Sequence, residues 1–108
     1  MTKKVYNKLV RDKIPEIIKQ SGAESTTRTL EIDEYRKELR KKLLEEVNEY
    51  IEAQSDEERL EERADIAEVL LWIDQVDNIP AEELERVRQD KAKKRGGFED
   101  KIFLIETN

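Results

Sequence analysis

The 108-residue sequence contains no cysteine and no histidine. Without cysteine there is no disulfide and no thiol nucleophile, and without either residue a zinc finger is excluded. The absence of histidine also excludes a Ser-His-Asp triad and an imidazole base. Any catalysis must therefore depend on carboxylates, Lys, Arg, Tyr, hydroxyl groups, backbone amides or a bound hard metal ion.

Long apolar runs are missing as well. No stretch approaches the roughly 20 apolar residues that span a bilayer, and the N-terminal residues lack the apolar region of a signal peptide. Charged residues make up 44% of the chain, yet Leu, Ile, Val and Phe are frequent enough for a folded domain with a thin core. We expect a single cytoplasmic domain, residues 1–108, with no membrane partner.

The net charge of −6 is unevenly distributed along the chain. Residues 1–20 carry six bases and two acids, residues 44–85 carry two bases and sixteen acids, and residues 86–95 carry six bases and one acid. A protein that binds nucleic-acid polymers usually has a dominant basic patch on a basic domain, which this chain lacks. The pattern instead suits carboxylates that gather cations beside basic groups that bind phosphate.

Apolar spacing and capping residues predict a mainly α fold. Asp12 and Asp33 are the expected caps of the first two helices, and Ser55 with Glu58 forms a capping box for the third. Two segments that are apolar or rich in β-branched residues are expected to pair as a short β element. The predicted helices cover residues 12–20, 33–53, 56–76 and 80–94, and the predicted strands cover residues 25–31 and 101–106.

The predicted helix over 56–76 has an unusually wide apolar stripe. Its main positions are Leu60, Ala64, Ala67, Leu70, Leu71 and Ile73, and Ile66, Val69 and Trp72 widen it. Two neighbouring helices and two short strands cannot fully cover so wide a stripe. We therefore expect an antiparallel helical bundle protomer that is completed by oligomerisation.

Two pairs of acidic residues stand out at helical spacing. Glu46 and Glu49 lie three residues apart, and Glu62 and Asp65 repeat that spacing about as far beyond the turn near residue 55. The two pairs should therefore face each other at one level of an antiparallel helix pair. Four such carboxylates repel one another unless a cation neutralises them, and Mg²⁺ or Mn²⁺ prefers oxygen ligands. The alternative is a solvated acidic surface, which is common on Glu-rich helices.

Two basic segments flank this acidic region. Residues 91–98 contain Lys91, Lys94 and Arg95 before a Gly-Gly pair, and the N-terminal segment contains Lys8 and Arg11. These five side chains are candidate phosphate ligands. Bases at a helix C-terminus also interact favourably with the helix dipole, so the alternatives are an ordinary helix end and an ordinary basic arm.

Taken together, these residues resemble the MazG-like, all-α nucleoside triphosphate pyrophosphohydrolases, which include phosphoribosyl-ATP pyrophosphohydrolase. The family pattern EExxE, a gap and then ExxD is matched by Glu45-Glu46-x-x-Glu49, twelve residues, and Glu62-x-x-Asp65. The opening segment of residues 7–15 and the tail from Lys91 to Phe98 also look like the family. The resemblance covers nearly the whole chain.

The resemblance implies that Glu46, Glu49, Glu62 and Asp65 bind Mg²⁺ and that the chain assembles as a homodimer or a dimer of dimers. It implies cleavage of a nucleoside triphosphate between the α- and β-phosphates, which releases a monophosphate and pyrophosphate. Without histidine, a water activated by the metal is the expected nucleophile, and Glu45 or Glu49 is the expected proton acceptor.

The resemblance leaves the substrate open. House-cleaning of NTPs or dNTPs is the first hypothesis, and phosphoribosyl-ATP hydrolysis in histidine synthesis is the second. A third is a helical dimerisation module without catalysis.

Overall fold

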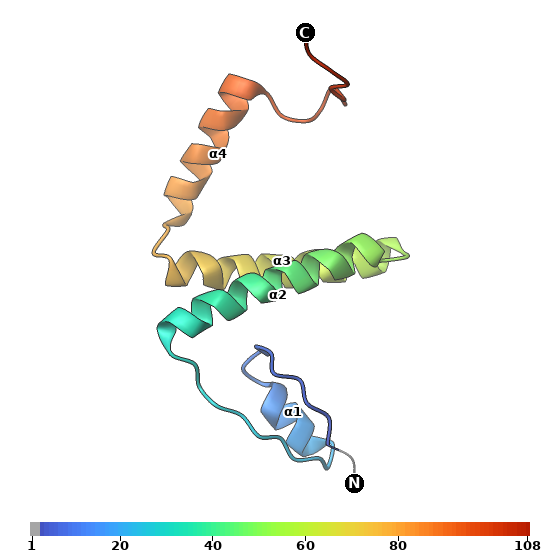
Figure 1. Cartoon of the computed structure of the whole chain (residues 1–108), viewed down its shortest axis with the longest axis vertical. Coiled ribbons are helices and arrows are strands. Elements are labelled where there is room, and N and C mark those ends of the chain that lie inside the picture. Colours follow the sequence, from blue (N-terminus) through green and yellow to red (C-terminus); the bar gives the residue numbers. More distant parts are fainter. Residues whose placement is uncertain (1–2) are drawn as a thin grey trace. The chain divides into compact units, whose positions relative to one another are not determined.

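The computed structural model describes residues 3–108, and its regular elements are all helices. They are α1 (Ile14–Gln20), α2 (Ile32–Glu52), α3 (Asp56–Val76) and α4 (Ala81–Arg95) (Figure 1). The predicted mainly α class is therefore confirmed. The chain divides into one compact unit that ends at Asp77 and another that runs from Asn78 to Asn108. Each unit is described by itself below, and the single domain over residues 1–108 stays a prediction.

The predicted two-stranded β element requires a correction. Residues 3–108 contain no strand, and both segments, 25–31 and 101–106, have extended or irregular backbone. Ile102 and Ile105 are 86% and 90% exposed, so no neighbour packs on the second segment. The preference of such residues for strands depends on packing against neighbours, and an isolated two-stranded ribbon is marginal in water.

The helix starts agree with the prediction only for α3. Ser55 accepts a hydrogen bond from the backbone N–H of Glu58, and the Glu58 carboxylate accepts one from the N–H of Gln54, so a reciprocal cap is present. The N-caps of α1 and α2 are Lys13 and Glu31, and neither makes a side-chain cap hydrogen bond. The predicted caps Asp12 and Asp33 are therefore wrong, because α1 begins one residue later and α2 begins two residues earlier than those caps require.

Helices α2 and α3 form the antiparallel pair that positions the candidate site (Figure 1). Residues 53–55 connect them, as predicted. Within residues 3–108 the buried apolar side chains are Leu39 on α2 and Ile66 and Val69 on α3. The core of this unit is thus thin, as the composition indicated.

The face that α3 turns toward α2 differs from the main predicted stripe. Ile66 and Val69 are buried, whereas Leu60 and Leu71 are 73% and 49% exposed. Ile66 and Val69, expected only to widen the stripe, therefore make the helix contact, whereas Trp72 is 45% exposed. Leu60 and Leu71, two main positions of the predicted stripe, lie on the side away from α2, and contacts of α3 on two sides stay a prediction.

The second unit contains α4 and the C-terminal residues. Gly96 ends α4 in the left-handed region, with φ of 82°, as the Gly-Gly pair predicted. No residue of α4 is buried, and Leu84 and Val87, predicted to face inward, are 47% and 40% exposed. Among the helices of residues 3–108, none is long and apolar enough to cross a membrane.

Candidate functional site

The helix pair brings together three of the four acids that the sequence suggested as metal ligands. Glu46 and Glu49 project from α2 and Glu62 projects from α3, and one carboxylate oxygen from each lies within 4.8 Å of the other two. The spacing of three residues on α2 places two carboxylates on one face, and the short connection at residues 53–55 places α3 opposite. Glu46, Glu49 and Glu62 are called the acidic cluster below.

Glu46 occupies a core position of α2. It follows Leu39 and Leu43 at helical spacings of four and three, and only 6% of its surface is exposed. One oxygen, Oε1, lies 3.5 Å from the Lys42 ammonium, whereas Oε2 is buried without a hydrogen-bond partner. A buried charged atom without a partner is costly to the folded state, so this position is unfavourable for stability alone.

Glu62 has the equivalent place on α3. It precedes Ile66 and Val69 at spacings of four and three, on the face that contacts α2. Its Oε2 atom is also buried without a partner. The two helices therefore each replace an apolar contact residue with a glutamate at the same level. In the sequence, Glu62 interrupts the apolar spacing that continues through Ile66 and Val69. This interruption was not recognised because another face of α3 was predicted to contact α2.

The surroundings of Glu46 and Glu62 raise the affinity of these two carboxylates for protons. Burial raises the pKa of Glu46, and the hydrogen bond and negative charge of Glu49 raise it further, while Lys42 opposes them. Desolvation also raises the pKa of Glu62, with the charges of Asp65 and Glu46 acting in the same direction and a hydrogen bond to Glu49 acting against it. A cation bound among these oxygens would favour their charged forms instead.

Asp65, the fourth predicted metal ligand, has another partner. Its Oδ1 atom accepts a hydrogen bond of 2.7 Å from Arg11. Asp65 is therefore outside the group of three converging carboxylates, although its charge acts on both Glu46 and Glu62. Its role as a metal ligand stays a prediction.

Glu45, one of the two predicted proton acceptors, is held by two lysines. Lys8 lies 3.1 Å from its Oε1 atom, and Lys42 lies 3.5 Å from its Oε2 atom. Burial acts to raise the pKa of Glu45, but the hydrogen bond from Lys8 and the charge of Lys42 outweigh it and hold the pKa below its usual value. Glu49, the other candidate, belongs to the acidic cluster and is exposed.

The predicted phosphate ligands fall in two different units. Lys8 and Arg11 lie in the first unit, directly against the acids. Lys91, Lys94 and Arg95 lie in the last turns of α4, in the second unit, and their role in phosphate binding stays a prediction. Sequence reasoning missed that Lys8 and Arg11 already have carboxylate partners, although the opposite charges of the two regions were the available signal.

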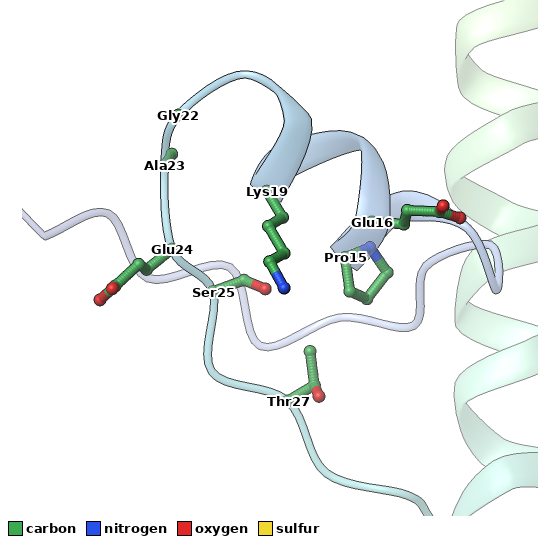
Figure 2. A pocket seen from close by; sticks show the side chains of 8 residues that line it. All are labelled: Pro15, Glu16, Lys19, Gly22, Ala23, Glu24, Ser25 and Thr27. Atoms are coloured by element: carbon green, nitrogen blue, oxygen red, sulfur yellow. The ribbon is translucent and has the colours of Figure 1, made fainter.

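An open hollow of about 670 Å³ lies beside α1, away from the acidic cluster. It is bounded by α1 and the segment that follows it, and the side chain of Lys19 extends from α1 toward Ser25 (Figure 2). None of the predicted site residues lines it. With a single base and no converging set of acids, it offers neither of the features expected of the predicted metal and phosphate site.

Comparisons of the chain with protein-family models, with curated proteins and with solved structures find no match. The functional argument therefore depends on the residues and their geometry.

Proposed function

We propose that the protein is a Mg²⁺-dependent nucleoside triphosphate pyrophosphohydrolase. It cleaves between the α- and β-phosphates, releases a monophosphate and pyrophosphate, and acts in the cytoplasm as a house-cleaning enzyme for NTPs or dNTPs. The observation that carries this proposal is the buried Glu46 carboxylate, whose Oε2 atom has no partner and which faces Glu49 and Glu62. A buried carboxylate oxygen without a partner destabilises the fold, and a bound cation would offset this loss of stability.

The donor set fits a hard divalent cation. Glu46, Glu49 and Glu62 offer only carboxylate oxygens, which suit Mg²⁺ and also Mn²⁺. Mg²⁺ is commonly held by one or two carboxylates together with substrate phosphates, and an open cluster at one side of a helix pair allows that arrangement. When bound, the ion supplies charge neutralisation at the phosphates and activation of water.

The chain's own residues supply the remaining functions. Glu49 is exposed within the acidic cluster and can accept a proton from an attacking water, while Glu45 is the alternative acceptor. Lys8 and Arg11 stand beside the cluster and can bind the phosphates of the substrate. Lys91, Lys94 and Arg95 are proposed to bind the leaving pyrophosphate.

The protein is also proposed to act as a homodimer or a dimer of dimers. The side of α3 away from α2 carries Leu60, Ala64, Ala67 and Leu71, a spacing of four, three and four residues. Leu60 and Leu71 are largely exposed in the protomer, and burial of such a stripe against a second copy is a strong driving force.

A pyrophosphate-release screen tests the proposed function. NTPs, dNTPs and phosphoribosyl-ATP are offered with Mg²⁺ to the unmodified protein, to Glu62→Gln and to the matched control Glu61→Gln. Because a catalytic metal contributes several kcal/mol, we expect Glu62→Gln to lower turnover by about 100-fold or more. Glu61 is exposed and outside the cluster, so its variant should keep normal turnover.

Three results would contradict all or part of the proposal. No pyrophosphate release from any substrate would favour the helical dimerisation module. Equal turnover of Glu62→Gln and the unmodified protein would exclude the acidic cluster as the active centre. Release from phosphoribosyl-ATP alone would replace the house-cleaning substrates with the histidine-pathway substrate.

A further inference from the structure

The N-terminal segment of residues 3–12, called the arm below, is attached to both helices of the candidate site. Lys8 lies 3.1 Å from Glu45 of α2, and Arg11 lies 2.7 Å from Asp65 of α3. These pairs join residues that are 37 and 54 positions apart in the sequence. The arm is therefore paired with one acid on α2 and one acid on α3.

The two acids that hold the arm flank the acidic cluster. Glu45 is adjacent to Glu46 in the sequence, and Asp65 lies one helical turn after Glu62. The hydrogen bond to Glu45 and the charge of Glu45 raise the pKa of Lys8, and the charges of Glu49 and Glu46 act in the same direction. The arm thus brings two positive charges to a group of carboxylates that has too few other cations nearby.

Two ion pairs attach the arm to the helices, and Leu9 is partly buried. The residues of the arm form no helix or strand, and Val5 and Tyr6 are 74% and 59% exposed. The Lys8–Glu45 and Arg11–Asp65 pairs are themselves partly exposed to solvent, and exposed ion pairs contribute little to stability. An additional cation at the cluster is therefore able to displace the arm.

We propose that the arm is a strap that a divalent cation releases. In the free protein Lys8 and Arg11 partly neutralise the site, and the cation takes over that neutralisation when it binds to Glu46, Glu49 and Glu62. Asp65 then becomes available to the cation, and the freed Lys8 and Arg11 become available to the phosphates of the nucleotide. This inference rests on the proposed cation site, and it makes cation binding the step that exposes the phosphate ligands.

Cation titrations without nucleotide test the competition. Mg²⁺ affinity is measured by calorimetry for the unmodified protein, for Arg11→Gln and for the matched control Lys13→Gln. Lys13 carries the same charge two residues away and makes no ion pair among the contacts of residues 3–108. Because an exposed ion pair corresponds to a factor of about two to five, Arg11→Gln should bind Mg²⁺ about two- to fivefold more tightly, and Lys13→Gln should bind it nearly as the unmodified protein does.

Limited proteolysis supplies the second readout. Trypsin cleavage after Lys8 is followed by mass spectrometry with and without Mg²⁺, and cleavage after the exposed Lys101 serves as the internal reference. Release of the arm should raise the relative rate of cleavage after Lys8 at least about twofold when Mg²⁺ is present. The same concentration of Mg²⁺ should not change the rate in Glu62→Gln.

The outcomes separate this inference from the proposed function. If Mg²⁺ binds and pyrophosphate is released, but the affinity of Arg11→Gln and the cleavage after Lys8 are unchanged, the strap is wrong and the enzyme stands. If Lys13→Gln gains as much affinity as Arg11→Gln, general charge accounts for the effect and the strap is again wrong. If no protein binds Mg²⁺, both the strap and the proposed metal site are overturned.

Discussion

The contact between α2 and α3 is apolar at one position along the helix pair and acidic at another. These two positions are called the apolar level and the acidic level. At the apolar level Leu39 of α2 and Val69 of α3 are both buried. At the acidic level, seven residues along each helix, Glu46 and Glu62 take the equivalent positions. Both levels belong to the same pair of helices, and they differ in the side chains that they bury.

This difference separates the residues that stabilise the fold from the residues that are proposed to bind a cation. Burial of Leu39 and Val69 stabilises the helix pair through the removal of apolar surface from water. Burial of Glu46 and Glu62 has the opposite effect, because each leaves a carboxylate oxygen without a partner. The apolar level therefore supports the acidic one, and the acidic level is proposed to serve cation binding rather than stability.

The largest effect is expected from truncation at the apolar level. Leu39 is 4% exposed, and Leu→Ala changes at buried sites cost about 2–5 kcal/mol. In a domain with a total stability of about 5–15 kcal/mol, Leu39→Ala should lower the free energy of unfolding severely, as urea denaturation would measure. The matched control is Leu44→Ala on the same helix, since Leu44 is 63% exposed. Equal losses for the two variants would contradict the assignment of the core.

A smaller effect of opposite sign is expected when the acidic level is made apolar. Glu46→Leu continues the spacing of Leu39 and Leu43 and removes an unpartnered buried oxygen. Replacement of buried charged groups by apolar residues is often stabilising by about 1–4 kcal/mol. We therefore expect Glu46→Leu to unfold at higher urea concentration in metal-free buffer at neutral pH while pyrophosphate release is lost. Destabilisation by this variant, with Glu61→Leu unchanged, would show that Glu46 serves the fold.

The sequence predicted the helices well because their signals are local. Apolar spacing, the Ser55 cap and the Gly96 stop each act within one or two turns. The meeting of Glu46, Glu49 and Glu62 was also predictable, since equal distances from a short turn place residues at the same level of an antiparallel pair.

The remaining features depend on long-range contacts. The side of α3 that meets α2 could not be chosen from the stripe, because Leu60 and Leu71 fit a helix contact as well as Ile66 and Val69 do. The segments 25–31 and 101–106 have strand-like residues, but residues 3–108 contain no strand. The approach of Arg11 to Asp65 joins residues 54 positions apart, and no local pattern encodes it.

Mg²⁺-dependent thermal unfolding tests the central claim, that the acidic level is a cation site, most directly. The melting temperature is measured at neutral pH with and without Mg²⁺ at equal ionic strength, for the unmodified protein, Glu62→Gln and Glu61→Gln. A ligand at about ten times its dissociation constant stabilises the folded state by about 1.4 kcal/mol, or several degrees for a domain of this size. The account predicts this rise in the unmodified protein and in Glu61→Gln, and its loss in Glu62→Gln. No rise in any of the three, or an equal rise in all three, would contradict it.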